Sequence, residues 1–405
     1  MELVLALFII GLVTTVGIMG RFLQNTRRIP ESIFLIFLGL LIGPIFNLIP
    51  ASALMPLIPL VSTLALIGIL LESGLDFEAQ KLNKEVRTSL ALIILVAFFT
   101  TVSVGAFLHF IFGWELLVAL LVGLICSGTT TLTTRVLLES TRAHAHVKRI
   151  LTLESIFNDI TLVLGVTILL AIMSSSAINT EEVAKSLAAS ISVALVLGAA
   201  AGWAWKSIME KAAPATKLGY ISTLGFCFLL YSFSDFVGGD PILSIFSFSI
   251  VLGNHEHIHR HFVKGKNYFG AIFSEIKRVQ GSFTFFMRAF FFFVLGVIFN
   301  FSLLETQVLP IVSGILLMIL ASRFFSVFIV SMRDKLLATH KFLITIMIPR
   351  GFVATVLSFI PAQYGVVIPN ITEIVLLLVF ASTAVAMFGT YSYNLISRRK
   401  KGRHA

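Results

Sequence analysis

Three polar side chains capable of binding ions or protons, Glu154, Asn158 and Asp159, interrupt an otherwise apolar stretch over residues 148–172. The stretch is long enough to cross a bilayer as a helix, where a carboxylate is costly unless it has a function or a partner. At about 100° per residue, Ser155 and Asp159 share one helix face, and Glu154 and Asn158 share the next. The two acids therefore point in different directions. This indicates one carboxylate facing a water-filled path and one paired with a cation from another helix, unless both merely hold helices together.

The composition of the chain restricts its fold class. Of 405 residues, 57% are hydrophobic and only 12% are charged, and the mean hydropathy is +0.99. A soluble fold needs more polar surface than this, so the sequence predicts an all-α polytopic membrane protein.

Apolar runs of about 17–25 residues, separated by charged or Pro/Gly-rich breaks, are typical of membrane-spanning helices. They predict thirteen transmembrane helices, over residues 3–20, 32–49, 56–75, 88–112, 115–139, 148–172, 183–206, 217–234, 240–254, 281–300, 307–331, 341–362 and 371–396.

Basic residues give an independent prediction of orientation, because cytoplasmic loops are enriched in them. All but five of the 30 lysines and arginines fall after odd-numbered predicted spans or in the tail, in segments 21–28, 81–87, 142–149, 206–217, 260–278, 333–341 and 398–403. We therefore expect an external N-terminus, a cytoplasmic C-terminus and a basic cytoplasmic tail at 397–405. Charge spread over seven segments argues against nucleic acid as a partner and favours contact with anionic lipid.

Two of the predicted spans contain helix-breaking sequences. The span 115–139 contains CSGTTTLTT, in which Gly128 and a threonine run weaken the helix, and the span 341–362 contains IPRG, in which Pro349 lacks a backbone donor. Interrupted spans at corresponding positions of two halves indicate a transporter binding site. We expect two inverted six-helix repeats with crossed discontinuous helices, at 1–172 and 217–396, joined by a linking span at 173–216.

Arginines within predicted spans need a partner or water. Arg323 and Arg350 lie deepest, and we expect them to belong to the structural or functional core. The partner of Arg288 is left open by the sequence, and Phe290 to Phe293, which follow it, are expected to face lipid.

The segment LESIFND at 153–159 resembles the Glu-Ser-x-x-Asn-Asp motif of monovalent cation/proton antiporters, in the Asn-Asp branch that includes NhaP-type sodium/proton antiporters. The resemblance extends to LESGL at 71–75, ASRFFSVF at 321–328 and IPRGFVA at 348–354.

The resemblance implies roles for particular residues. Asp159 would exchange cation and proton, and the ion-binding residues would be Asp159, Asn158, Ser155, Thr129 and Glu72, with sodium held by Asp159, Ser155 and Thr129. Glu154 and Arg323 would form a structural ion pair, and Thr130 and Arg350 would support the helix crossing. The family usually has an acid where this chain has Thr130, which leaves cation selectivity open.

The function implied is exchange of sodium or lithium for protons. Cation and proton would compete for Asp159, and elevator-like alternating access would make the exchange electroneutral with 1:1 stoichiometry. Potassium/proton antiport is the alternative, and a cation channel or intramembrane enzyme is a remote one. The resemblance further implies a homodimer in the cell membrane that acts in pH homeostasis, is not an enzyme and uses no cofactor.

A histidine-rich segment, HEHIHRH at 255–261, lies in a predicted cytoplasmic loop, and His144 and His146 lie in another. Alternate histidines can bind metal or respond to pH near 6.5, but the pattern favours a solvated loop over either role. The sequence leaves these three interpretations open.

Overall fold

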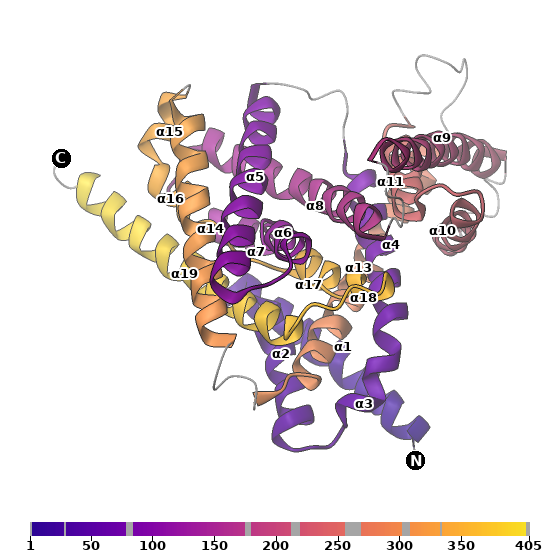
Figure 1. The fold of residues 1–405 in the computed structure, drawn as a ribbon, viewed down its shortest axis with the longest axis horizontal. Helices are drawn as coiled ribbons and strands as arrows, with labels where there is room; N and C mark the ends of the chain where they lie inside the picture. The colour runs from indigo at the N-terminus through magenta and orange to yellow at the C-terminus, as the bar shows by residue number, and fades with distance from the viewer. Residues whose placement is uncertain are drawn as a thin grey trace. The chain divides into compact units, whose positions relative to one another are not determined.

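The computed structural model describes residues 2–27, 30–77, 84–174, 180–211, 219–255, 269–301, 308–332 and 334–401, and the regular elements within these ranges are all helices (Figure 1). Eight helices in the described ranges are long and apolar enough to cross a membrane. They contain α1 (Glu2–Arg27), α4 (Ile58–Leu75, preceded by α3, Ala51–Leu54, and η2, Met55–Leu57), α5 (Lys84–Phe112), α8 (Ala145–Ser174), α9 (Thr180–Lys211), α13 (Phe269–Val297), α14 (Val308–Ser331) and α19 (Ile371–Lys401).

Shorter helices occupy the remaining predicted spans. They are α2 (Glu31–Leu40, continued by η1, Leu41–Ile45), α6 (Leu116–Ile125), α7 (Thr131–Glu139), α10 (Gly219–Phe236), α11 (Pro241–Gly253), α16 (Lys341–Ile346), α17 (Phe352–Leu357) and α18 (Ile360–Gln363). A further short helix, α15 (Lys335–Thr339), lies in the predicted loop 333–341. Each predicted span thus overlaps at least one helix, while the number of spans that cross the membrane stays a prediction.

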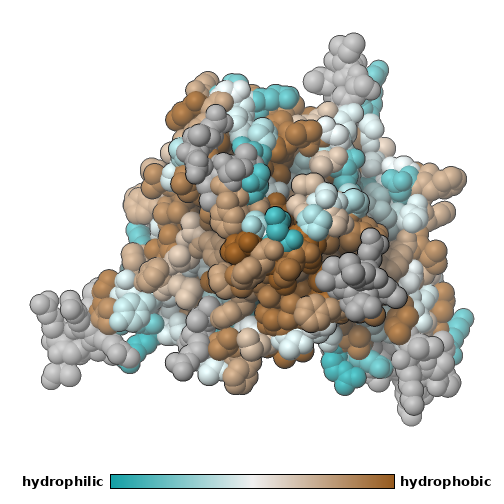
Figure 2. Space-filling view, turned by 90° about the horizontal axis from the view of Figure 1, so that it is seen from below, coloured by the Kyte–Doolittle hydropathy of each residue, from teal (hydrophilic) through white to brown (hydrophobic). Residues whose placement is uncertain are grey.

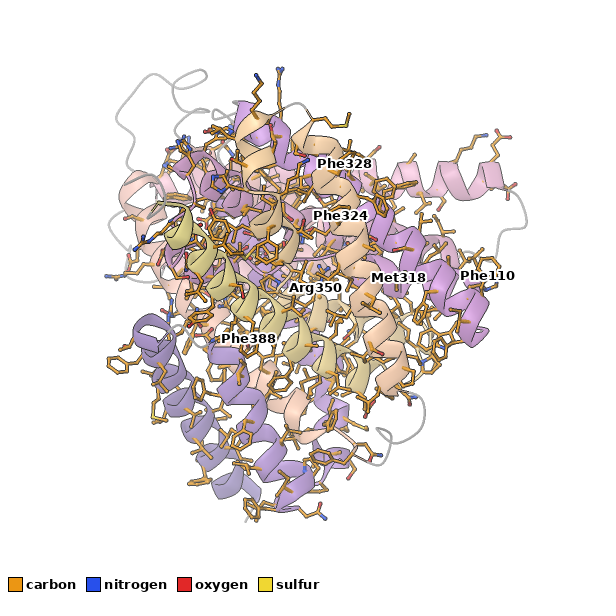
Figure 3. All side chains as sticks on the ribbon, turned by 90° about the vertical axis from the view of Figure 1, so that its left-hand side faces the viewer. Phe110, Met318, Phe324, Phe328, Arg350 and Phe388 are labelled. Carbon is orange, nitrogen blue, oxygen red and sulfur yellow. The ribbon has the colours of Figure 1, made fainter. Side chains whose placement is uncertain are left out.

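Large hydrophobic side chains are exposed on many of these helices, as expected for a surface that meets lipid. Figure 2 shows a face on which hydrophobic residues, in brown, predominate over hydrophilic ones. In Figure 3, Phe324 and Phe328 of α14 and Phe388 of α19 lie on the outside of the molecule, and all three are exposed.

The chain divides into two compact units. The smaller contains residues 63–82 and 171–287. In it, Gly198 and Gly202 allow α9 to approach α11 closely, since a Cβ at either glycine would meet the backbone of Ser244 or Phe248. The larger unit contains residues 1–62, 83–170 and 288–405. This division does not follow the predicted repeats, whose inverted symmetry stays a prediction.

Close packing in the larger unit corrects one expectation. Phe291, Phe292 and Phe293 are buried, at 2%, 1% and 0% exposure, so the prediction that they face lipid was wrong. Glycines explain the difference, because a Cβ at Gly39 or Gly296 would overlap the backbone of the other helix and α2 therefore lies directly against α13. Aromatic rings of the α17 region cover another part of this face, with the Phe291 and Phe359 centroids 5.6 Å apart.

Both predicted breaks are present, and they meet. α6 ends at Ile125 and α7 begins at Thr131, while α16 ends at Ile346 and α17 begins at Phe352. The amide of Thr130 donates to the carbonyl of Pro349 over 2.9 Å, so the two extended segments pair through their backbones. A Cβ at Gly351 would overlap the Thr130 side chain, which makes glycine necessary for so close a crossing. The opened backbone is thereby buried in protein, as its depth in a membrane requires.

Candidate ion-binding site

Asp159 lies on α8, half-buried, beside the crossing of the two interrupted helices. Its side chain lines a narrow pocket together with Gly128, Thr129 and Thr130 from one break, Gly351 from the other, and the apolar residues Leu162, Val353 and Ala354. The hydroxyl of Thr131, the first residue of α7, donates to Asp159 Oδ2 over 3.4 Å. The break in each helix thus brings backbone and hydroxyl groups to a carboxylate on a third helix.

Several buried polar atoms near Asp159 lack hydrogen-bond partners among the residues that the structure describes. Thr129 Oγ1 and Asn158 Nδ2 are such atoms, although each residue is only 3% exposed. The Asn158 amide lies against Gly128, where a Cβ would come within 3.3 Å of Nδ2. Ser155 is fully buried on the same helix as Asp159, and its hydroxyl donates to the carbonyl of Thr152 over 2.9 Å.

This arrangement suits a hard monovalent cation. A carboxylate and hydroxyl oxygens are ligands that such cations prefer, by analogy with calcium and magnesium sites. Within the described ranges, no group of three or more histidine, cysteine, aspartate or glutamate side chains could hold a metal. A cation here would depend on the single carboxylate of Asp159 and on neutral oxygens.

Glu154, one turn before Asn158 on α8, is paired with Arg323 of α14. Nη1 and Nη2 of Arg323 each donate to one carboxylate oxygen of Glu154 over 2.7 Å, and Nε donates to the carbonyl of Ile344 over 2.8 Å. The Arg323 and Glu154 side chains are 0% and 3% exposed. The bidentate, charge-assisted pair and the bond to Ile344 together engage each of the three guanidinium nitrogens in directions set by three helices.

Arg350 lies in the second break, within the interior of the molecule (Figure 3). Nη1 of its guanidinium donates to the carbonyl of Gly128, and its backbone amide donates to Ser382 Oγ over 3.0 Å. Arg350 therefore ties the second break to both the first break and α19. Its Nε and Nη2 have no partner among the described residues.

A second polar pocket adjoins that of Asp159, and Thr130 and Gly351 line both. It contains the partner that the sequence left open, because Nη1 of Arg288 lies 3.2 Å from Oε1 of Glu31. The backbone amide of Glu31 donates to the side chain of Gln24 over 2.9 Å. One feature of the sequence could have identified this pair: Glu31 is an acid that directly follows Pro30 at the start of an apolar run.

The remaining predicted residues lie elsewhere. Glu72 is on α4 in the smaller unit and is not among the residues that line the pocket of Asp159. His257, His259 and His261 lie outside the described residues. His255 is buried, with Nδ1 3.0 Å from the carbonyl of Leu252.

His146 connects three elements at one end of the larger unit. Its two ring nitrogens lie 3.2 Å from Glu85 of α5 and 3.1 Å from Asp334, the residue that caps α15. Burial raises the pKa of Asp334, but hydrogen bonds from His146 and from the amides of Leu336 and Leu337 outweigh it and hold that pKa below its usual value.

Comparison with known proteins relates this site to a family. A family model described as "Sodium/hydrogen exchanger, transmembrane" matches residues 7–391. Na(+)/H(+) antiporter 1 of Methanocaldococcus jannaschii is 27% identical over 161 residues, which are 39% of this chain and 38% of that protein. K(+)/H(+) antiporter NhaP2 of a Shewanella species is 28% identical over 204 residues, which are 50% of this chain and 36% of that protein. The matches thus span less than two fifths of these relatives' length.

The fold is also similar to a solved one. The structure of the sodium proton antiporter MjNhaP1 from Methanocaldococcus jannaschii at pH 8 superposes with a TM-score of 0.72 and 22% identity, covering 98% of this chain and 96% of that chain. This likeness concerns the fold alone. It confirms the prediction of an all-α, multi-pass membrane protein.

Proposed function

Because the chain belongs to the sodium/hydrogen exchanger family, we propose that it exchanges sodium or lithium for protons across a membrane. The predicted resemblance to monovalent cation/proton antiporters of the NhaP type is thereby confirmed at the level of the family. The family consists of secondary transporters rather than enzymes, and its members need no cofactor.

One observation carries the proposal: the carboxylate of Asp159 lines the same pocket as the opened backbone at Gly128 and Gly351 and as the hydroxyl of Thr129. Placing a carboxylate in a membrane-spanning helix is costly, so Asp159 is stabilised by binding either a proton or a cation. The two ions compete for one group, with Ser155 and Thr129 supplying oxygens to the cation. Asn158, the neighbour of the acid in the motif, belongs to the proposed ion-binding set, and its amide lies against Gly128 of the first break.

Competition produces exchange when the loaded site is exposed to one side of the membrane and then to the other. Asp159 is neutralised equally by a proton and by a monovalent cation, so both loaded forms carry the same charge. We therefore propose electroneutral 1:1 exchange by elevator-like alternating access. The Glu154–Arg323 pair and Arg350 act as fixed supports of the helices that meet at the site.

Potassium/proton antiport is a second candidate. The NhaP2 relatives carry a K(+)/H(+) description, and positions 129–131 of this chain are all threonine. Neutral hydroxyls at the crossing leave the site with one fewer negative charge than an acid at 130 would give, which weakens discrimination in favour of the smaller ion.

The cellular setting is part of the proposal. The distribution of basic residues supports an external N-terminus and a cytoplasmic C-terminus in the cell membrane. There the exchanger would contribute to pH homeostasis as a homodimer in contact with lipid.

Proton flux in proteoliposomes tests the function. Purified protein is reconstituted with an internal pH indicator, and sodium, lithium, potassium or choline is added outside. We expect proton movement with sodium and lithium, loss of that movement in Asp159→Asn, and retention in the control Asp235→Asn, whose side chain is exposed on α10. Movement with potassium alone would favour the second candidate, and a flux that persists in Asp159→Asn would refute the assignment of the site.

A current that follows the membrane potential, recorded during sodium-driven flux, would contradict the electroneutral stoichiometry while leaving the role of Asp159 intact.

A further inference from the structure

His146, the second residue of α8, has a carboxylate on each side of its ring. Nδ1 lies 3.2 Å from Oε1 of Glu85, in the first turn of α5, and Nε2 lies 3.1 Å from Oδ2 of Asp334, which caps α15. The side chains of His146, Glu85 and Asp334 are only 18%, 15% and 10% exposed. One imidazole thus joins helices that come from three separate parts of the chain.

The number of protons on this ring decides whether both contacts are attractive. An ionised carboxylate only accepts hydrogen bonds, and a ring nitrogen donates one only when it carries a proton. The imidazolium form has an N–H on each nitrogen, whereas neutral imidazole has one N–H and turns the lone pair of its other nitrogen toward a carboxylate. The bridge from α5 to α15 is therefore complete only when the ring of His146 is protonated. Histidine is the side chain that ordinarily changes charge between pH 5 and pH 8.

Both carboxylates keep other donors when the bridge opens. Glu85 also accepts from Nη1 of Arg149, which lies 3.3 Å from its Oε2 on the exposed side of the cluster. Asp334 also accepts from two amides in the first turn of α15, over 3.0 and 3.4 Å. Neither acid is left as an unpaired buried charge, so the cost of releasing one contact of His146 stays small. The cluster can therefore open and close reversibly.

The other basic side chains near the ring have partners elsewhere or face solvent. His144, in the loop before α8, is exposed, and its Nδ1 accepts from the backbone amide of His146 over 3.2 Å. Lys148 donates to a backbone carbonyl over 2.8 Å. His340, between α15 and α16, lies 2.7 Å from a tyrosine hydroxyl of α19. Protonation of His146 itself is therefore the change that makes or breaks the bridge.

Short connectors attach this bridge to both interrupted helices. α7 ends at Glu139, and only residues 140–144 separate it from α8. His340 alone separates α15 from α16, and the carbonyl of Ile344 in α16 accepts from the buried Arg323. A displacement of α15 is therefore transmitted to α16, which ends at the second break.

We propose that His146 is a pH-dependent latch, whose protonated ring holds α8 to both α5 and α15 and whose neutral ring frees α15. None of the three residues of the latch lines the pocket of Asp159. The latch therefore acts on that pocket only through the helices that it holds. It is a conformational device beyond the proposed function, and it regulates exchange because a freed α15 no longer fixes α16 and the second break.

Spin labels on α5 and α15 test the latch without transport. The labels are attached to Arg87→Cys and Ala338→Cys, at two exposed positions, while the native Cys126 and Cys227 are buried. Double electron–electron resonance then measures the distance between the labels in lipid nanodiscs at pH 5 and at pH 8. We expect a single short distance at pH 5 and an added longer one at pH 8. The ratio of short to long should fall by about three- to tenfold, as for loss of one partly buried, charged hydrogen bond.

Two substitutions of His146 separate its protonation from other effects of pH. His146→Arg stays charged and has donors for both carboxylates, so the short distance should persist at pH 8. His146→Gln has no charge to lose, so its longer distance should be present equally at both pH values. The matched control is His144→Gln, which replaces the exposed neighbouring histidine and should respond to pH as the wild type does.

Several results would overturn the latch. A wild-type distance that does not change with pH would do so, as would a pH response that persists in His146→Gln. Loss of the response in His144→Gln would equally overturn it, because the titrating group would then be the other histidine.

Flux measurements show whether the latch regulates exchange. In proteoliposomes at pH 8, sodium-driven exchange should be about three- to tenfold faster in His146→Arg than in His146→Gln, since only the closed latch holds α16 in place. Equal rates in two variants whose label distances differ would refute the regulation of exchange. Absence of flux in the wild type would refute the proposed function, whereas the distance measurements would still decide whether the latch exists.

Discussion

Replacing Glu154 by glutamine preserves the size of the side chain but removes the negative charge that faces Arg323. The Arg323 side chain is fully buried and the Glu154 side chain is 3% exposed. The two hydrogen bonds that join them are 2.7 Å long, as expected of charge-assisted bonds. Water cannot reach the guanidinium group once its partner is neutral, so the charge of Arg323 would stay buried without compensation.

The size of the effect follows from this burial. Removing one partner of a buried ion pair costs about 3–5 kcal/mol, because the remaining charge is left desolvated. An exposed pair contributes at most about 1 kcal/mol. The chain offers such a pair as a matched control, since Lys185 and Glu181 lie 2.7 Å apart on α9 with side chains 75% and 71% exposed.

Unfolding of the purified protein in mixed micelles, monitored by circular dichroism as the denaturing detergent is increased, measures the difference. We expect Glu154→Gln to lower the free energy of unfolding by about 3–5 kcal/mol and Glu181→Gln to lower it by less than about 0.5 kcal/mol. In the double variant Glu154→Leu/Arg323→Met, neither charge remains, so the loss should be smaller than in Glu154→Gln. Equal losses in Glu154→Gln and Glu181→Gln would show that the pair is not buried from water, and would refute the reasoning.

Two further expectations concern pH and backbone packing. Burial lowers the pKa of His340, and the charge of His144 lowers it further, so the fold favours the neutral imidazole, which lies 2.7 Å from the Tyr393 hydroxyl. The stabilisation is complete above the unfolded pKa of about 6.5 and is lost as the pH falls through the lower folded pKa. The melting temperature should therefore fall between pH 7.5 and pH 5, and it should fall less in His340→Gln. An identical fall in both proteins would contradict this expectation. Gly351→Ala should abolish exchange, because the added Cβ would overlap the Thr130 side chain and force the two breaks apart. Adding Thr130→Gly to the same chain should partly restore exchange. Wild-type flux in Gly351→Ala alone would show that the crossing is looser than described.

The sequence alone determined the class of the protein and the positions of its interrupted helices. Runs of apolar residues at this density can only be buried in lipid or in other helices, which predicts membrane helices without any tertiary information. Gly128 and Pro349 weaken a helix through local backbone chemistry, and both lie in the segments where the helices are broken. The helical periodicity also places Glu154 and Asp159 on different faces, since each residue turns the helix by about 100°.

The tertiary structure decided which groups meet. Glu31 and Arg288 are 257 residues apart, and no local pattern relates them. The hydroxyl that reaches Asp159 is that of Thr131, which was not singled out within the threonine run, because the choice depends on where α7 begins and how α8 passes it. Burial of Phe291 to Phe293 likewise follows from the close approach of α2, which Gly39, far away in the sequence, makes possible together with Gly296 of α13. Hydropathy reports how apolar a residue is, whereas only packing decides whether lipid or another helix covers it.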